Sequence, residues 1–181
     1  MLLEDGTGRG YKVKVTDENM LRVCAQTEYE ISHVSEAHGQ AYIWTATADW
    51  GIDVNALWLR NDSLTDNLMI ERIIATMAAA AVIEIWVGTG NTAAGTAVTG
   101  VNLNRGSSNI AQATCKHTNT NVNAGAGMTL LQTVQLPITN ARPVTFLNAL
   151  ILDYYDEIAI NIVTDVASSS VNILGYFHSP D

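Results

Sequence analysis

Short apolar segments with period-two alternation, separated by turn residues, are the feature that most constrains the fold of this chain. The segment 81–88 (AVIEIWVG) is the clearest, with Val82, Glu84 and Trp86 expected on one face, because side chains alternate across a strand. Further strands are predicted at 11–15, 20–26, 41–48, 54–60, 67–77, 144–153, 157–165 and 171–177. Many short strands with turn signals between them predict an all-β sandwich or barrel.

Two regions depart from this pattern. Residues 27–38 fit an amphipathic helix poorly, and we predict an irregular linker that can include extended structure. Residues 88–127 are rich in glycine, alanine, threonine and asparagine, with weak strands predicted at 96–104 and 109–116. We expect this middle region to form loops at one end of the sandwich, with a subunit contact as one option.

The glycine-rich start of the chain predicts a flexible arm rather than a phosphate site. Residues 6–10 (GTGRG) follow no predicted strand, lack the GxGxxG spacing and precede a strand instead of a helix. A dinucleotide or phosphate cradle needs a helix N-terminus directly after its glycines. We therefore predict an N-terminal arm and linker at residues 1–38 and a β-sandwich domain at residues 39–181.

Basic residues are concentrated in that arm. The chain has 18 acidic and nine basic residues and a net charge of −9. Four of the basic residues lie in the first 22 positions: Arg9, Lys12, Lys14 and Arg22. No nucleic-acid partner is predicted, because phosphate binding requires a basic stripe. Two interpretations of the four basic residues stay open, an arm that docks on an acidic partner and one face of a solvated strand.

Composition predicts a soluble chain whose surface is partly covered by other subunits. Charged residues make up 15% of the sequence, against about 25% in an average soluble domain. No apolar run has the length of a membrane span and no signal peptide opens the chain, so we expect synthesis in the cytoplasm and no membrane partner. Cys24 and Cys115 have no CxxC spacing; a disulfide between them stays open, with buried free thiols favoured.

No group of residues forms a catalytic or metal-binding motif, and we predict no enzyme activity, no cofactor and no metal. The histidines at 33, 38, 117 and 178 are isolated in the sequence, without zinc-ligand spacing. The aspartates at 49, 53, 62 and 66 lie close together but lack the regular spacing of a calcium loop. Turn formation is therefore favoured over calcium binding for these aspartates.

Aromatic residues give the candidate binding surface. Trp50 precedes Gly51 between two predicted strands, which makes it the candidate for an exposed aromatic platform. Tyr154 and Tyr155 lie in DYYDE (153–157), where a hairpin turn is favoured over an acid/base pair. These three residues are the candidate glycan contacts, because exposed aromatic rings stack on sugars. The other tryptophans lie on predicted strands, where core or inter-subunit packing is favoured: Trp44, Trp58 and Trp86.

Three segments resemble a family of viral proteins. LLEDGTGRGYKVKVTDENMLRV at the start, GQAYIWTA, and ALILDYYDEIAINIVTD followed by VNILGYF at the end are similar to small virion structural proteins of tailed bacteriophages, of the head decoration, cement or head-fibre type. The resemblance is structural and carries over no functional residue. It implies a jelly-roll-like antiparallel β-sandwich, assembly into a homotrimer or larger ring, and an extended N-terminal arm that contacts the capsid or a neighbouring subunit.

The function expected from these observations is that of a non-enzymatic phage virion protein. A capsid decoration or cement protein on the head surface comes first, with the major capsid protein or another virion protein as partner and Arg9, Lys12, Lys14 and Arg22 as contacts of the arm. One alternative is a fibre or receptor-binding protein whose 88–127 loops contact a host surface. The alternative of another class is a carbohydrate-binding module.

Overall fold

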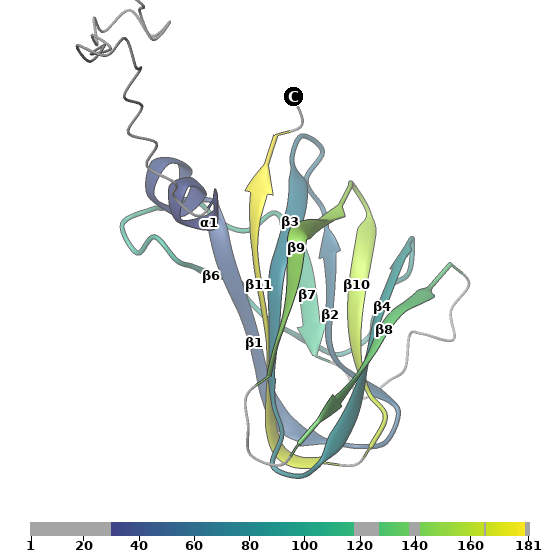
Figure 1. Cartoon of the computed structure of the whole chain (residues 1–181). Coiled ribbons are helices and arrows are strands. Elements are labelled where there is room, and N and C mark those ends of the chain that lie inside the picture. Colours follow the sequence, from purple (N-terminus) through teal and green to yellow (C-terminus); the bar gives the residue numbers. More distant parts are fainter. Residues whose placement is uncertain (1–29, 118–126, 138–141, 165, 180–181) are drawn as a thin grey trace, which may run out of the picture.

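The computed structural model describes residues 30–117, 127–137, 142–164 and 166–179, which form two antiparallel sheets packed together (Figure 1). The strands are β1 (Ala41–Trp50), β2 (Val54–Asn61), β3 (Asn67–Thr76), β4 (Ala81–Thr89), β5 (Thr96–Ala97), β6 (Val101–Asn102), β7 (Ala113–His117), β8 (Thr129–Leu136), β9 (Arg142–Leu152), β10 (Asp156–Ile162) and β11 (Val166–His178). The predicted all-β sandwich is therefore confirmed, and the segments expected at 11–15 and 20–26 lie outside the described residues. No helix in the described ranges is long and apolar enough to cross a membrane.

The strand order follows a nested pattern. One sheet has the order β6-β1-β11-β3-β9 and the other β5-β7-β2-β10-β4-β8. The long strands pair antiparallel from the ends of the chain inward: β1 with β11, β2 with β10, β3 with β9 and β4 with β8. Each sheet therefore joins strands that are far apart in the sequence, which is why periodicity alone does not give the pairing.

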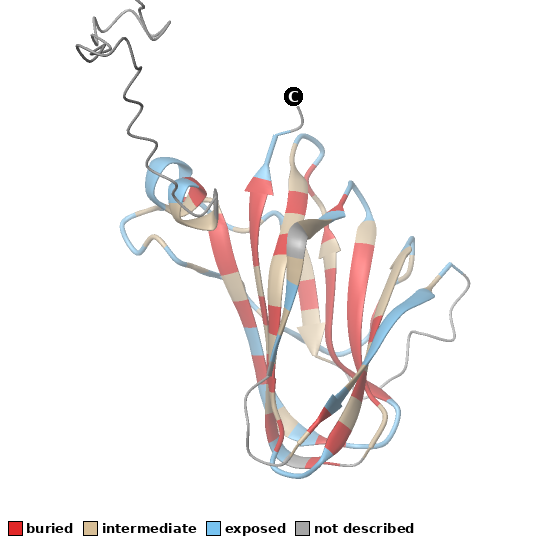
Figure 2. Cartoon of the chain, in the orientation of Figure 1, coloured by how far each residue is buried: buried red, intermediate tan, exposed pale blue. Residues whose placement is uncertain are grey.

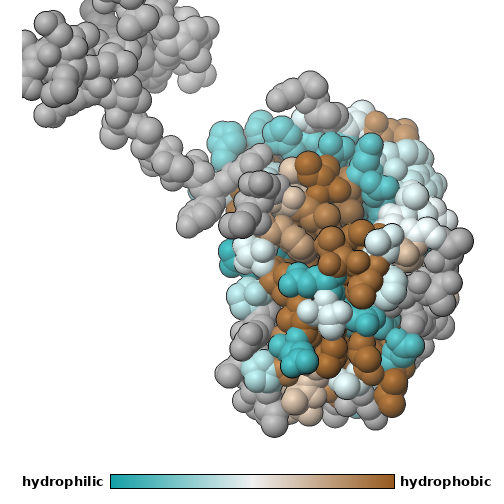
Figure 3. Space-filling model, turned by 45° about the vertical axis from the view of Figure 1, so that its right-hand side comes forward, coloured by the Kyte–Doolittle hydropathy of each residue, from teal (hydrophilic) through white to brown (hydrophobic). Residues whose placement is uncertain are grey.

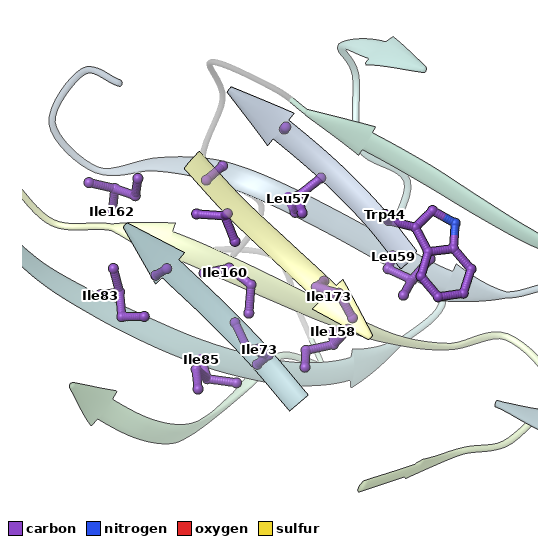
Figure 4. Close-up of a cluster of buried hydrophobic side chains, with 14 of the residues drawn as sticks. Trp44, Leu57, Leu59, Ile73, Ile83, Ile85, Ile158, Ile160, Ile162 and Ile173 are labelled. Atoms are coloured by element: carbon purple, nitrogen blue, oxygen red, sulfur yellow. The ribbon is translucent and has the colours of Figure 1, made fainter. Parts of the chain in front are cut away.

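The core fills the space between the two sheets. In β4, Ile83 and Ile85 are buried while Val82, Glu84 and Trp86 are only half-buried, as the alternation predicts. Figure 4 shows Trp44 and Leu59 with isoleucines from both sheets pointing into this layer, and Figure 2 shows buried positions recurring along the strands. Burial of this many large apolar side chains is the dominant favourable term in folding.

Residues 30–38 are helical, which corrects the irregular or extended linker expected there. A single α-turn, α1 (Glu30–His33), runs into a π-helical turn, η1 (Val34–His38). Gly39 ends it in the left-handed region, with φ of 61°, and its N–H donates to the carbonyl of Ser35 over 3.1 Å. Val34 is buried against Ala41 and Tyr176. The segment is too short for helix propensity to stabilise it, so packing on the sandwich does so.

The described part of the middle region lies along one side of the sandwich. The prediction of loops at one end of the sandwich is therefore wrong in this respect. β5 and β7 extend the six-stranded sheet beyond β2, whereas β6 extends the five-stranded sheet beyond β1. The weak strand expected at 96–104 is reduced to β5 and β6, and that expected at 109–116 is found as β7. Small residues allow this close approach, since a Cβ on Gly100 would lie 2.6 Å from Nε1 of Trp44.

Candidate functional site

The predicted contacts of the arm are not part of the described structure. Arg9, Lys12, Lys14 and Arg22 lie in residues 1–29, outside the described ranges, and so does Cys24. Their roles stay predictions. Cys115 is a free thiol on β7, 3% exposed, and its burial raises the pKa of the thiol above its ordinary value.

Trp50 is buried, so its prediction as an exposed platform is wrong. It is 0% exposed and belongs to the main core cluster. The strand continues past Ala48 through a register shift, and Trp50 still pairs with Val166 of β11. Its ring meets that of His117 edge-on at a centroid distance of 6.0 Å. Gly51 marks the turn correctly, but the turn begins one residue later than the tryptophan.

Tyr154 and Tyr155 are exposed, at 44% and 41%, in the turn between β9 and β10. Tyr155 has a φ of 66°, and the N–H of Asp156 donates to the carbonyl of Asp153 over 3.0 Å. The predicted turn is confirmed, but it is not a hairpin, because β9 and β10 belong to different sheets. The turn therefore crosses from one sheet to the other at an end of the sandwich (Figure 1).

Neighbouring strand ends hold this turn on both sides. The N–H of Tyr155 donates to the carbonyl of Asn61, over 2.9 Å, and the Tyr155 carbonyl accepts from the hydroxyl of Thr89, over 3.2 Å. The buried side chain of Asn61 donates to the carbonyl of Leu152 over 3.0 Å. Because β2, β4 and β9 all contribute to these bonds, the two tyrosines stand on a fixed backbone.

Arg60 packs under this turn. Its guanidinium carbon lies 4.5 Å from the ring centroid of Tyr155 and 5.4 Å from that of Trp58, within the range of cation–π attraction. Its Nε donates to Oδ1 of Asp62 over 2.8 Å. Tyr154 meets Tyr155 edge-on at 4.4 Å. Local desolvation, followed by the hydrogen bond and charge of Tyr155, raises the pKa of Tyr154 above its ordinary value.

A buried carboxylate fixes the layer beneath. Glu157 is 0% exposed, and its Oε2 accepts from the indole Nε1 of Trp58 over 2.6 Å. Its Oε1 accepts from the backbone N–H of Asn91, over 3.1 Å, and from the Asn91 side-chain amide. Trp58 packs with Ala93 in a cluster separate from the main core, and Nζ of Lys116 donates to the Ala93 carbonyl over 2.8 Å. Residues 91–93 thus cover the part of the six-stranded sheet around Trp58 and Glu157.

We call the surface made by Tyr154, Tyr155, Arg60 and Asp62 the tyrosine ledge. It offers two phenols, a guanidinium and a carboxylate, groups that can hydrogen-bond a polar ligand. The sequence places Tyr154 and Tyr155 in the site, but Arg60 and Asp62 come from the end of β2 and the turn after it. Only the pairing of β2 with β10 brings them there, and no local sequence signal reveals it.

The aspartates serve separate turns. Asp49 accepts from the N–H of Ser168, over 2.6 Å, and Asp53 accepts from the side chain of Asn161, over 2.9 Å. Asp66 accepts from the hydroxyl of Ser179, over 2.7 Å. Within the described ranges no three histidine, cysteine or acidic side chains are grouped so as to hold a metal ion.

Three of the histidines come together, although the sequence does not group them. A cavity of about 300 Å³ is lined by His33, His38 and His178 together with Val34, Gln40 and Phe177. The rings of His33 and His38 meet edge-on at a centroid distance of 5.7 Å. The helical turn of residues 30–38 creates this grouping, because it docks beside the end of β11.

Comparison with known proteins gives no relative. No protein-family profile, no curated protein and no solved structure matches this chain. Its function must therefore be inferred from its own residues and geometry.

Proposed function

We propose that this chain is a non-enzymatic virion structural protein of a tailed bacteriophage, a capsid decoration or cement protein that binds the head surface through its N-terminal arm. The nested strand order is the observation that carries this proposal. Such a protein needs a rigid body that presents surface and an arm that orders on binding, with the entropy of ordering offset by burial on the shell.

The nested order supports the jelly-roll interpretation. When the short β5, β6 and β7 are set aside, eight long strands remain, four in each sheet. They pair as one long antiparallel hairpin rolled onto itself. The β4–β8 pair lies nearest the turn of this hairpin, and the β1–β11 pair lies at its open end. Eight strands in two sheets are the pattern of jelly rolls, a common architecture of capsid domains. Folds host many functions, so the function needs its own test.

The proposed arm is followed in the sequence by a segment that docks on the body. Residues 30–38 contact the ends of β1 and β11 through Val34. Four of the nine basic residues precede this segment, and the whole chain carries a net charge of −9. Residues 1–29 also hold five acidic residues, so the arm is close to neutral while the body is strongly acidic. Contact with an acidic partner surface would rest on the four basic side chains themselves.

Charge reversal tests the proposal. The Lys12→Glu/Lys14→Glu double variant of the full chain should co-sediment less with heads of the source phage stripped of this protein. Arg105→Glu, an exposed body residue, is the control and should bind like the unchanged protein. Circular dichroism should show all three folded equally. Equal head binding by the double variant and the unchanged chain would contradict the arm as the attachment segment.

Carbohydrate binding is a second candidate, favoured by the exposure of the tyrosine ledge. With Trp50 buried, this function would rest on Tyr154 and Tyr155 beside Arg60 and Asp62. Isothermal titration with a glycan panel should then give heat that the Tyr154→Ala/Tyr155→Ala variant loses and the Leu64→Ala control keeps. No heat with any glycan would reject it. Binding of glycans from the host surface would favour the fibre or receptor-binding role over decoration.

A further inference from the structure

The sandwich is open along the side where β8 and β9 lie. Leu130, Leu131 and Ile151 are 43%, 45% and 53% exposed. Four more apolar side chains of these strands are only half-buried where they meet the core: Val134, Val144, Phe146 and Leu150. Figure 3 shows an apolar band running down one face of the molecule between hydrophilic patches. We call the surface formed by β8 and β9 the open side.

Apart from Arg142 at the start of β9, neither strand carries the charged residues that commonly protect a sheet edge. β8 ends the six-stranded sheet and β9 ends the five-stranded sheet, without an outer partner in the described part of the chain. Exposed edges commonly carry charged residues that prevent association, yet residues 127–137 and 143–152 contain no charged residue. On β3, next to β9, Glu71 and Arg72 pair with each other at 3.4 Å. On β4, next to β8, Glu84 lies opposite Thr133 and its Oε2 accepts from Nε1 of Trp86 over 3.0 Å.

Both edges are irregular in backbone, which limits how a partner can bind. β8 has a register shift beside Leu131, between Ile85 and Trp86 of β4. β9 has one beside Phe146, between Ile70 and Arg72 of β3, and Ala149 has a φ of 54°. Such bulges interrupt the ladder a new strand would need. A partner on this side would therefore be held by apolar side chains rather than by strand addition.

We propose that the open side binds a second copy of this chain. Each copy carries a net charge of −9, so most mutual orientations bring like charges together, which opposes association. The open side is free of that repulsion, because it presents no charged residue of β8, and none of β9 after Arg142. A cationic partner would instead be drawn to the acidic remainder of the surface.

This inference does not depend on the virion function, since it uses only strands β8 and β9. A protein that fails to bind phage heads can still pair through its open side, and a monomer can still bind heads. Whether the assembly closes as a dimer or as the trimer expected from the resemblance is given directly by its measured mass.

Sedimentation equilibrium of the full chain over a wide concentration range tests it. The unchanged protein should show reversible association, and Leu131→Lys should raise its dissociation constant by about tenfold or more, because the variant places an unpaired charge in an apolar contact. Leu64→Lys is the matched control: Leu64 is 78% exposed but lies in the turn between β2 and β3, and its variant should associate like the unchanged chain.

Ile151→Lys, on β9, provides a second variant should Leu131→Lys misfold, as judged by circular dichroism. A monomeric unchanged chain at every concentration would overturn the proposal. So would unaltered association of folded Leu131→Lys and Ile151→Lys, or equal loss of association in Leu64→Lys.

Discussion

The two lateral sides of this sandwich differ in what covers the edges of the long strands. On one side, which we call the closed side, β5, β6 and β7 extend both sheets, and Val98, Ala111 and Ala113 pack against the core. On the open side, β8 and β9 end the sheets and leave leucines and isoleucine exposed. A segment of the same chain covers the first side, and it exposes Val101, Leu103 and Ile110 of its own. The second side has no such cover in the described part of the chain and keeps large apolar residues on the edge strands themselves, as expected where another chain provides the cover.

The largest expected effect is a difference between the two sides in how much a truncated side chain lowers the free energy of unfolding. Trp44→Ala removes a side chain that is 0% exposed and lies beneath Gly100 on the closed side. It should lower the free energy of unfolding by about 3–5 kcal/mol, measured by urea denaturation at low protein concentration. Leu131→Ala on the open side should change it by about 0.5 kcal/mol or less. Similar losses in both variants would mean that the open side is part of the monomer core.

A smaller effect tests how tightly the closed side is packed. In Gly100→Ala the new Cβ would lie 2.6 Å from Nε1 of Trp44 and 3.2 Å from Cβ of Ala111, so the core must shift. We expect a loss of about 1–3 kcal/mol in unfolding free energy. Gly106→Ala is the control, because the nearest atom, Oδ1 of Asn104, is at an ordinary 3.4 Å. An unchanged Gly100→Ala would show that this contact is loose.

Glu157→Gln tests how residues 91–93, which precede β5 of the closed side, are held in place. The carboxylate uses one oxygen for Trp58 and the other for Asn91, whereas an amide has only one acceptor oxygen. One donor is then left unpaired in a buried site, for a loss of about 1–3 kcal/mol in unfolding free energy. Glu36→Gln, at an exposed position, should have little effect. Equal stability of the two variants would contradict the anchoring role.

The smallest expected effect concerns the turn after β2, which belongs to neither side. The Ser179 hydroxyl, followed by those of Thr65 and Ser63, holds the pKa of Asp66 below its ordinary value of 3.8, against partial desolvation. A carboxyl with a lowered folded pKa contributes stability above its unfolded pKa, and that contribution is lost as pH falls through the folded pKa.

Stability measured below about pH 4 should therefore fall less steeply in Asp66→Asn than in the unchanged chain. The Thr65→Ala variant should lie between them. Because Asp66 is largely solvated, we expect differences of only tenths of a kcal/mol. Identical acid limbs for Asp66→Asn and the unchanged chain would contradict the lowered pKa.

Alternation predicted β3 and β4, which bury mainly one face, and it also gave β2 and β10, although these are buried on both faces. The bounds of β2, β3 and β4 are close to those predicted, including 67–77, where a helical period competed with the strand, whereas the strand predicted at 157–165 ends at Ile162. Alternation missed β8, since TLLQTVQL breaks the pattern at Leu130 and Leu131, where the register also shifts. The sequence signal that could have revealed β8 is the pair of residues that bound it, Gly127 before the strand and Pro137 after it.

The sites depend on contacts that local sequence does not encode. The prediction that Trp50 is exposed failed because the adjacent Gly51 suggested a turn. The indole ring of Trp50 is instead packed through the pairing of β1 with β11 and the contact with His117. Arg60 reaches Tyr155 through the pairing of strands almost a hundred residues apart. The exposure of Tyr154 and Tyr155, by contrast, could be predicted from the sequence. Two adjacent aromatic residues lie there among three carboxylates, and a strand would not bury all five side chains together.

Hydrogen exchange of the full chain at low and high concentration tests the central claim, that a second copy covers the open side. We predict that peptides from 127–137 and 142–152 gain protection as concentration rises. Peptides from 96–117 on the closed side should exchange equally at both concentrations. Protection gained on the closed side, or no change in either region while the mass increases, would contradict it.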